Sequence, residues 1–400
     1  MSTAHRNQRA GIPIWAIILA VAMALALLLL LVYFLRTAES SEEDLIESRP
    51  GSRADTVVEH SSTGTFTGPL TSGAWYELGF TDPKYPDNPA NHRGGLDELL
   101  VGLINRSQRT LDVAIYDFDL QNVAEAMAKA SARGVRVRMV TDSDTIGKTK
   151  DKAIQDAFAS ISAASIPVID DKRRPIMHDK FVVADGEWVL MGSWNFTDGD
   201  TYRLNNNTAI IQSRDLAANY TAEFEQMFGQ RKFGGAKTGG APHPKLAVAG
   251  TTIENYFCPE DKCAAQVIRW VNSAHQQIHF MAFSFTHDGI GDAMLERARN
   301  GVQVAGVFET TGSETQFSEY GRLKRAGLDV LQDGSPWTMH HKVIVIDNRV
   351  TIFGSFNFSS NADHDNDENL LIADDPSLAA AFEAEYQRVR NVALNPPARR

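Results

Sequence analysis

Residues 178–185 read His-Asp-Lys-Phe-Val-Val-Ala-Asp, and residues 340–347 read His-His-Lys-Val-Ile-Val-Ile-Asp. Both stretches contain His-x-Lys-x4-Asp, and each is followed after six residues by Gly-Ser-x-Asn, at 192–195 and 354–357. A single His-x-Lys pair is too short to indicate a function. Two full copies, 162 residues apart, indicate an internal duplication in which each half supplies half of one site.

The residues around each copy predict the same order of elements in both halves. A strand, a helix, a Gly break and a second strand follow one another at 111–140 and again at 278–308. This order is that of a βαβ unit, which implies parallel strands and a right-handed crossover. Each His-x-Lys then begins a further strand, followed by a turn and a return strand. We therefore predict an α/β fold of two similar βαβ-built lobes with mixed sheets and the motifs at their junction.

The N-terminal part of the chain contains an apolar run. Residues 12–35 include no charged side chain, and the run is long enough to cross a bilayer as a helix. Arg6 and Arg9 precede it and an acidic stretch follows, so the positive-inside rule places the N-terminus in the cytoplasm and the remainder outside. A cleaved signal peptide with secretion is the alternative, although its apolar region usually spans only about 7–15 residues. We predict one N-terminal transmembrane helix.

Changes in composition divide the chain. The acidic, Ser- and Gly-rich stretch after the apolar run predicts a flexible stalk, and a Gly-, Lys- and Pro-rich segment separates the halves. The net charge of −11 argues against a generally basic surface for coating nucleic acid. The predicted parts are a cytoplasmic N-terminus (1–11), a transmembrane anchor (12–35), a stalk (36–73), repeat 1 (74–228), a linker (229–250), repeat 2 (251–392) and a tail (393–400).

The sequence contains two cysteines, Cys258 and Cys263. In an exported domain they could close a small disulfide loop, and two reduced thiols are the alternative that the sequence leaves open. A zinc site would need four ligands, and no further cysteine or nearby His pair completes such a set.

The residue types of the duplicated motif predict chemistry on a phosphodiester. A neutral imidazole can attack phosphorus, and a second, protonated imidazole can donate to the leaving oxygen. Lys can neutralise the non-bridging oxygens, and Ser and Asn can add neutral donors. Because these side chains supply the charge that a divalent metal would offer, we predict no metal and no cofactor. The predicted catalytic residues are His178, Lys180, Ser193, Asn195, His340, Lys342, Ser355 and Asn357.

Asp185 and Asp347 complete the shared pattern, but each stands at a predicted hairpin turn. An Asp in that place more often forms the turn than takes part in catalysis. We therefore predict a structural role for both.

The paired pattern, His-x-Lys-x4-Asp followed by Gly-Ser-x-Asn, resembles the HKD signature of the phospholipase D superfamily, over roughly residues 74–389. The resemblance implies a two-lobed, metal-independent phosphodiesterase that works through a phosphohistidine intermediate. It also implies an acidic residue downstream of the motif that orients a histidine. Phospholipases, lipid synthases and endonucleases share this build, so the resemblance indicates the reaction better than the substrate.

The two halves differ downstream of the motif. Glu368 stands 28 residues after His340, whereas Asn206 stands 28 residues after His178. A carboxylate fixes the tautomer of an imidazole and stabilises its positive charge, but an amide can only orient the ring. This argument predicts that His340, supported by Glu368, is the nucleophile. The resemblance favours the first histidine instead, with Asp198 and Asp200 as alternative partners for His178.

Three functions fit the sequence. The first is an enzyme that cleaves phospholipid head groups at a membrane surface, to which the anchor would hold it. The second is an endonuclease-like enzyme, for which a basic cluster before the first motif could follow a nucleic-acid backbone. The third is a binding protein without catalytic activity. For all three functions, the sequence implies no obligate protein partner. The residues of the basic cluster are Lys172, Arg173 and Arg174.

Overall fold

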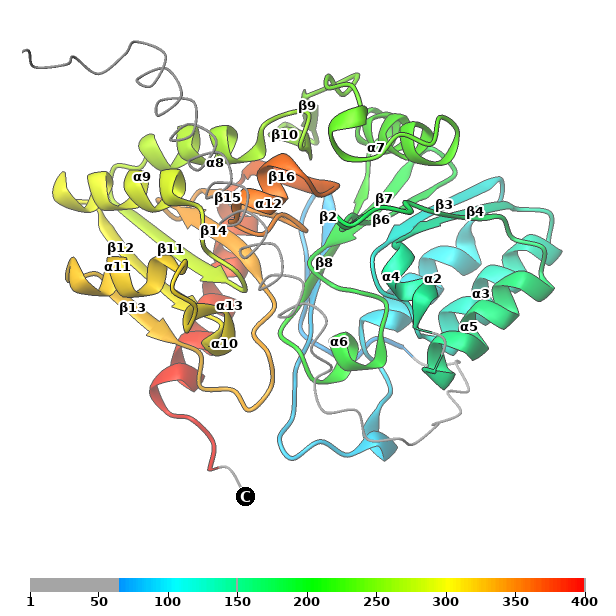
Figure 1. Cartoon of the computed structure of the whole chain (residues 1–400), viewed down its shortest axis with the longest axis horizontal. Coiled ribbons are helices and arrows are strands. Elements are labelled where there is room, and N and C mark those ends of the chain that lie inside the picture. The colour runs from blue at the N-terminus through cyan, green and yellow to red at the C-terminus, as the bar shows by residue number, and fades with distance from the viewer. Residues whose placement is uncertain (1–64, 149, 399–400) are drawn as a thin grey trace, which may run out of the picture. The chain divides into compact units, whose positions relative to one another are not determined.

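The structure is a computed structural model that describes residues 65–148 and 150–398. No helix in these two ranges is both long and apolar enough to cross a membrane, and the predicted anchor at 12–35 lies outside the described residues. Each repeat forms one α/β lobe around an eight-stranded mixed sheet (Figure 1). The prediction of two similar lobes with mixed sheets is therefore confirmed.

The sheet of lobe 1 has the order β1-β2-β8-β7-β6-β3-β4-β5. Strands β3, β4 and β5 pair in parallel, and the other neighbours pair antiparallel. The strands are β1 (Leu70–Ser72), β2 (Tyr76–Phe80), β3 (Thr110–Ile115), β4 (Arg136–Thr141), β5 (Val168–Asp170), β6 (Lys180–Ala184), β7 (Trp188–Gly192) and β8 (Asn207–Gln212). The helices are η1 (Pro89–Asn91), α2 (Leu96–Arg106), α3 (Gln121–Ala132), α4 (Ser143–Gly147), α5 (Lys152–Ala163), α6 (Asp198–Tyr202) and α7 (Arg214–Phe228).

Lobe 2 repeats this topology in the order β13-β12-β11-β14-β15-β16-β10-β9. Its parallel strands are again the βαβ strands β11, β12 and β13. The strands are β9 (Lys245–Val248), β10 (Thr251–Cys258), β11 (Gln277–Ala282), β12 (Gln303–Phe308), β13 (Asp329–Gln332), β14 (Lys342–Ile346), β15 (Val350–Gly354) and β16 (Glu368–Asp374). The helices are η2 (Gly234–Ala236), α8 (Cys263–Asn272), α9 (Asp288–Arg299), α10 (Thr310–Ser313), α11 (Glu319–Arg325), α12 (Ser360–His364) and α13 (Pro376–Leu394).

The two sheets share one central hydrophobic core. Tyr220 on α7 packs edge-to-face against Phe181 of lobe 1 and Phe257 of lobe 2, with ring centroids 4.9 and 5.0 Å apart. On the other side, Phe382 of α13 contacts Phe80 of lobe 1 and Phe353 of lobe 2. Strands such as β6 and β14 are buried along their whole length, because both faces of each sheet are covered. The last helix of each repeat therefore joins the lobes.

Two boundaries differ from the sequence prediction. The stalk was expected to extend to residue 73, but Leu70–Ser72 form edge strand β1, paired with β2. The segment 229–250, expected as a linker, contains η2 and the strand β9, which pairs with β10. The strand β9 was not predicted, because the segment is rich in Gly and Pro and β9 contributes only two buried apolar side chains.

Candidate active site

The backbones of the two repeats cross beside both motif histidines. Met177, just before the first motif, pairs with Asp367 of repeat 2, and Met339, just before the second, pairs with Asn205 of repeat 1. The His178 N–H donates to the Asp367 carbonyl at 2.9 Å, and the His340 N–H donates to the Asn205 carbonyl at 3.0 Å. Each histidine is therefore held by a residue within two positions of the start of β16 or β8 of the opposite repeat.

This crossing decides which carboxylate meets which histidine. His178 Nδ1 lies 2.8 Å from both carboxylate oxygens of Glu368, and both side chains are fully buried. The expected pairing of Glu368 with His340 is therefore wrong. Spacing along one repeat was used to match the partners, but the pairing runs between repeats.

His340 has the neutral partner. Its Nδ1 lies 2.8 Å from Asn206 Oδ1, and the Asn206 amide donates to Asp200 Oδ1 at 3.2 Å, which fixes the orientation of the amide. Asp200 Oδ1 itself lies 3.5 Å from His340 Nδ1. Asp198 instead contacts His92 at 2.8 Å. Neither aspartate is placed by these contacts as the predicted alternative partner of His178.

The motif serines support the partners of the histidines. Ser355 Oγ donates to Glu368 Oε2 at 2.5 Å, and Ser193 Oγ donates to Asn206 Oδ1 at 2.8 Å. Each hydroxyl therefore supports the group that contacts a histidine. The glycine before each serine is required by packing, because a Cβ on Gly192 or Gly354 would lie 2.2 Å from a backbone carbonyl oxygen of the neighbouring strand.

Both motif lysines are almost fully buried beside their histidines. Lys342 Nζ lies 2.8 Å from His340 Nε2, and Lys180 Nζ donates to the His178 carbonyl at 3.1 Å. The aromatic residues next to them were not predicted from the sequence. Tyr116 follows β3 and packs edge-to-face against His178, and Phe283 follows β11 and packs in the same way against His340. Both residues could have been predicted from the sequence, because they follow corresponding strands of the two repeats.

Both asparagines of the Gly-Ser-x-Asn motifs are buried as well. The Asn195 amide donates to Asp200 Oδ1 at 3.3 Å, and Asn357 occupies the corresponding position after β15. Asn195 is thereby tied to the group that orients Asn206.

Asp185 and Asp347 lie away from the histidines and hold backbone. The Asp185 carboxylate accepts the N–H groups of residues 108–110, and the Asp347 carboxylate accepts those of residues 275–277. These hydrogen bonds keep the pKa of both groups below its usual value, although partial burial acts in the opposite direction. Such contacts fit the predicted structural role.

Another buried carboxylate shapes the approach to the first motif. Asp142, at the end of β4, accepts the Met177 N–H at 2.7 Å. Burial raises the pKa of Asp142 to about 7, with the nearby Asp171 adding to the effect. The position of the residue before His178 therefore depends on a group that titrates near neutral pH.

The three residues of the basic cluster before the first motif do not form one exposed basic surface. Arg173 forms an ion pair with Asp367 and donates to the Asp365 carbonyl at 2.8 Å, so it links the repeats. Lys172 and Arg174 are exposed. The expectation that all three residues guide substrate is therefore wrong for Arg173, whose charge is used inside the protein.

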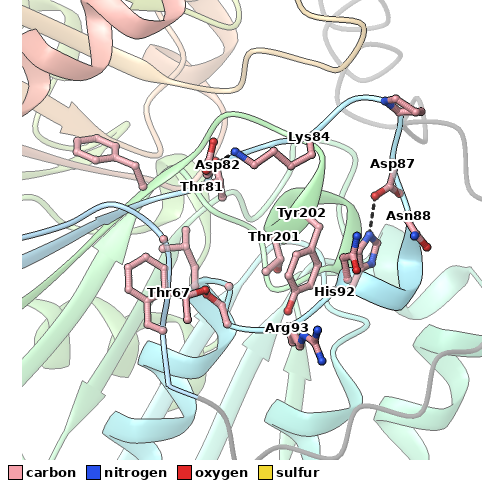
Figure 2. A pocket seen from close by; sticks show the side chains of 18 residues that line it. Thr67, Thr81, Asp82, Lys84, Asp87, Asn88, His92, Arg93, Thr201 and Tyr202 are labelled. Atoms are coloured by element: carbon pink, nitrogen blue, oxygen red, sulfur yellow. Dashed lines mark hydrogen bonds and ion pairs between the residues drawn. The ribbon is translucent and has the colours of Figure 1, made fainter. Parts of the chain in front are cut away.

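A pocket of about 340 Å³ lies in lobe 1 and is lined by none of the motif residues (Figure 2). Its buried His92 is held between Asp87, at 2.7 Å, and Asp198, at 2.8 Å, and stacks on Tyr202. Thr81 connects the pocket to the site, because its hydroxyl accepts the Asn206 N–H at 2.7 Å.

Cys258 and Cys263 form a disulfide. Of the two alternatives left open by the sequence, the structure contains the bonded form. Cys258 also lies opposite Glu368 in the pairing of β10 with β16, so the disulfide loop begins next to the site.

Comparison with known proteins identifies relatives of both repeats. The family model described as "Cardiolipin synthase, PLD-like domain" matches residues 100–228 and 267–390. A mitochondrial cardiolipin hydrolase of Chlamydomonas reinhardtii is 29% identical over 203 residues, 45% of this chain and 90% of its own length. A phospholipase D of Rickettsia conorii is 32% identical over 130 residues, 32% of this chain and 65% of its own length.

A solved structure is similar across both lobes. The phosphatidylserine synthase of Haemophilus influenzae aligns with a TM-score of 0.54 over 74% of this chain and 84% of its own chain, at 12% identity. At this identity the likeness indicates a shared fold only.

Proposed function

The chain belongs to the phospholipase D superfamily and is a phosphoric diester hydrolase, and we propose that it cleaves phospholipid head groups through a covalent phosphohistidine on His178. The observation that carries the choice of nucleophile is the contact of His178 with Glu368 at 2.8 Å in a fully buried setting. A carboxylate on Nδ1 leaves Nε2 as the attacking atom and stabilises the positive charge that develops on the ring.

His340 serves as the acid and base in this proposal. In the first step the His178 Nε2–phosphorus bond forms, the bond to the head-group alcohol breaks, and protonated His340 supplies the proton to the leaving oxygen. In the second step His340 takes a proton from water, the water oxygen bonds to phosphorus, and His178 leaves. The neutral partner Asn206 suits this role, because His340 must bind and release a proton in each cycle.

Lys180 and Lys342 neutralise the phosphate in both steps. Their ammonium groups are held next to the two histidines in a buried site, where an opposite charge interacts more strongly than in water. We keep the prediction that no metal ion is required, because the two lysines supply the positive charge that a metal would offer.

The choice of lipid over nucleic acid rests on two observations. The relatives named above are a cardiolipin hydrolase and a phospholipase D. In addition, Arg173 of the basic cluster is engaged in an ion pair between the repeats. We further propose that residues 12–35 anchor the enzyme in a membrane with its catalytic lobes outside the cytoplasm, which protease protection of sealed vesicles would test.

Turnover by the full-length chain tests the substrate and the nucleophile together. Vesicles of phosphatidylcholine, phosphatidylglycerol or cardiolipin should release head groups in the presence of EDTA, and single-stranded DNA should remain intact. Acid-quenched samples should contain labelled phosphate on His178, and His178→Asn should contain none. Cleavage of DNA without lipid turnover would reject the lipid assignment, and label on His340 would reject the nucleophile.

A further inference from the structure

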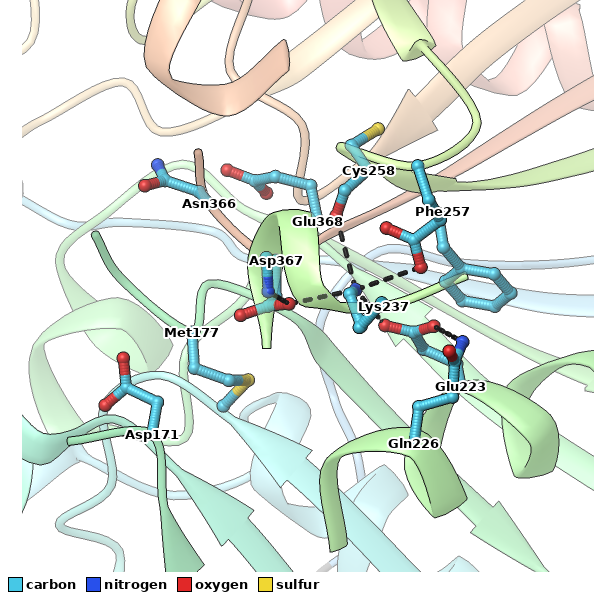
Figure 3. Close-up of polar contacts among 12 residues, drawn as sticks. Asp171, Met177, Glu223, Gln226, Lys237, Phe257, Cys258, Asn366, Asp367 and Glu368 are labelled. Atoms are coloured by element: carbon cyan, nitrogen blue, oxygen red, sulfur yellow. Dashed lines mark hydrogen bonds and ion pairs between the residues drawn. The ribbon is translucent and has the colours of Figure 1, made fainter. Parts of the chain in front are cut away.

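A buried lysine lies behind the His178–Glu368 pair in the segment between the repeats. The Lys237 ammonium group contacts Glu223 and lies 2.9 Å from Asp367 Oδ1 and 3.2 Å from Glu260 Oε1. It also donates to the Cys258 carbonyl at 3.3 Å. Figure 3 shows Lys237 between these groups.

The partners of Lys237 come from four parts of the fold. Glu223 lies on α7, Glu260 lies in the disulfide loop, Asp367 precedes β16, and Cys258 ends β10. The lysine side chain is fully buried, and the acidic side chains around it are at most 5% exposed. Although burial lowers the pKa of Lys237, the surrounding carboxylates raise it well above the usual value, so it stays charged.

A further carboxylate makes the balance of charge here sensitive to Lys237. Asp179 follows His178, is fully buried, and accepts no hydrogen bond from the described residues. Burial raises the pKa of Asp179 to about 8, and the charge of Lys237 acts in the opposite direction. Loss of this lysine would remove the positive charge that these buried carboxylates share, and they would then have to bind protons.

Asp367 connects this cluster to the active site. Its carboxylate accepts the Gly234 N–H at 2.7 Å and also pairs with Arg173. Its backbone accepts the His178 N–H and donates to the Ile176 carbonyl at 3.1 Å, and the next residue is Glu368. The position of Asp367 therefore sets both members of the His178–Glu368 pair.

The other half of the site lacks such an anchor. Asn205 occupies the place of Asp367 and makes the matching backbone contacts with Thr338 and His340. An amide cannot form an ion pair, so no lysine is needed at that position. Among the residues that the structure describes, the charged anchor lies in the half that contains the proposed nucleophile.

We propose that Lys237 is a positioning residue for catalysis, which fixes Asp367 and thereby holds Glu368 against His178. This inference rests on the proposed function of His178 and Glu368. It assigns a role in the reaction to the segment that joins the repeats, which the sequence suggested to be only a linker.

Lys237→Met in the full-length chain tests the proposal, because Met keeps the length of the side chain and removes the charge. We expect kcat on phosphatidylglycerol vesicles to fall at least tenfold with little change in KM. Lys245→Met is the matched control, since Lys245 lies in the same segment, is exposed and pairs with Glu254.

A charge-balanced variant separates positioning from stability. In Glu223→Gln/Lys237→Met one buried negative charge is removed with the lysine, so the melting temperature should recover while kcat stays low, because Asp367 keeps Arg173 and Gly234 as partners but still lacks the ammonium group. Recovery of both quantities would show a purely structural role and overturn the proposal. Unchanged kcat in Lys237→Met would overturn it as well.

An NMR signal of His178 makes the result independent of turnover. In the full-length chain with labelled histidines, the His178 Nδ1–H proton that is hydrogen-bonded to Glu368 should move upfield in Lys237→Met and stay in place in Lys245→Met. An unshifted Nδ1–H signal would reject the positioning role even in an active enzyme. A parent chain that cleaves no lipid would reject the proposed function, and the NMR shift would still decide the role of Lys237.

Discussion

Glu368→Gln should be the most informative single substitution in the site. Glutamine keeps the size of the side chain, and its carbonyl can still accept from His178 Nδ1, so the change removes mainly the negative charge. At the observed separation of 2.8 Å and an effective dielectric constant of about 20, that charge stabilises an imidazolium by about 6 kcal/mol. Because the remaining amide dipole recovers part of this energy, we expect kcat to fall by about 10³- to 10⁴-fold.

The assay should measure the formation of the phosphoenzyme as well as steady-state turnover. If His178 is the nucleophile, Glu368→Gln slows the appearance of labelled phosphohistidine by the same factor as kcat. Glu385→Gln is a matched control, since Glu385 is also buried and lies 2.9 Å from the ring of a buried histidine, His341, outside the proposed chemistry. A folded Glu368→Gln enzyme that loses less than about tenfold in kcat would refute the electrostatic argument.

Three further predictions concern stability. Arg173→Ala should lower the free energy of unfolding by about 2 kcal/mol, because it breaks a partly buried ion pair between the repeats, whereas urea denaturation of Lys172→Ala should match the parent. The raised pKa of Asp142 means that the folded chain binds a proton more tightly than the unfolded chain, so the free energy of unfolding should fall as pH rises from about 4 to about 7. Asp142→Asn should flatten this dependence on pH, and an unchanged slope would contradict the assignment. Reduction of the disulfide should lower stability by about 2 kcal/mol, as expected for closing a short loop, and equal denaturation midpoints with and without reductant would contradict this.

The duplication made much of the fold predictable. The βαβ pattern, the strand after each His-x-Lys and the turn at each Asp follow from local periodicity, and all of them are present. Short edge strands were missed, because β1 and β9 contain few buried apolar residues and owe their conformation to pairing with β2 and β10.

The partners within the site were less predictable. His178 and Glu368 are 190 residues apart, and neither hydrophobic period nor motif spacing indicates that the repeats exchange partners. The contact of Ser355 was not predicted for the same reason, because its acceptor could be identified only after Glu368 was placed. The buried position of Lys237 could not be predicted, because an isolated lysine in a Gly-rich stretch is expected to be solvated.

The crossing of the repeats also bears on how such a site can change. In an assembly of two identical chains related by two-fold symmetry, every substitution alters both half-sites at once. Here each histidine takes its partner from the opposite repeat, but both repeats belong to one polypeptide. A mutation at 206 or 368 therefore alters one histidine and leaves the other untouched. Because the two repeats are fused in one chain, each half-site can acquire substitutions that the other lacks. A glutamate at position 368 can therefore coexist with an asparagine at position 206.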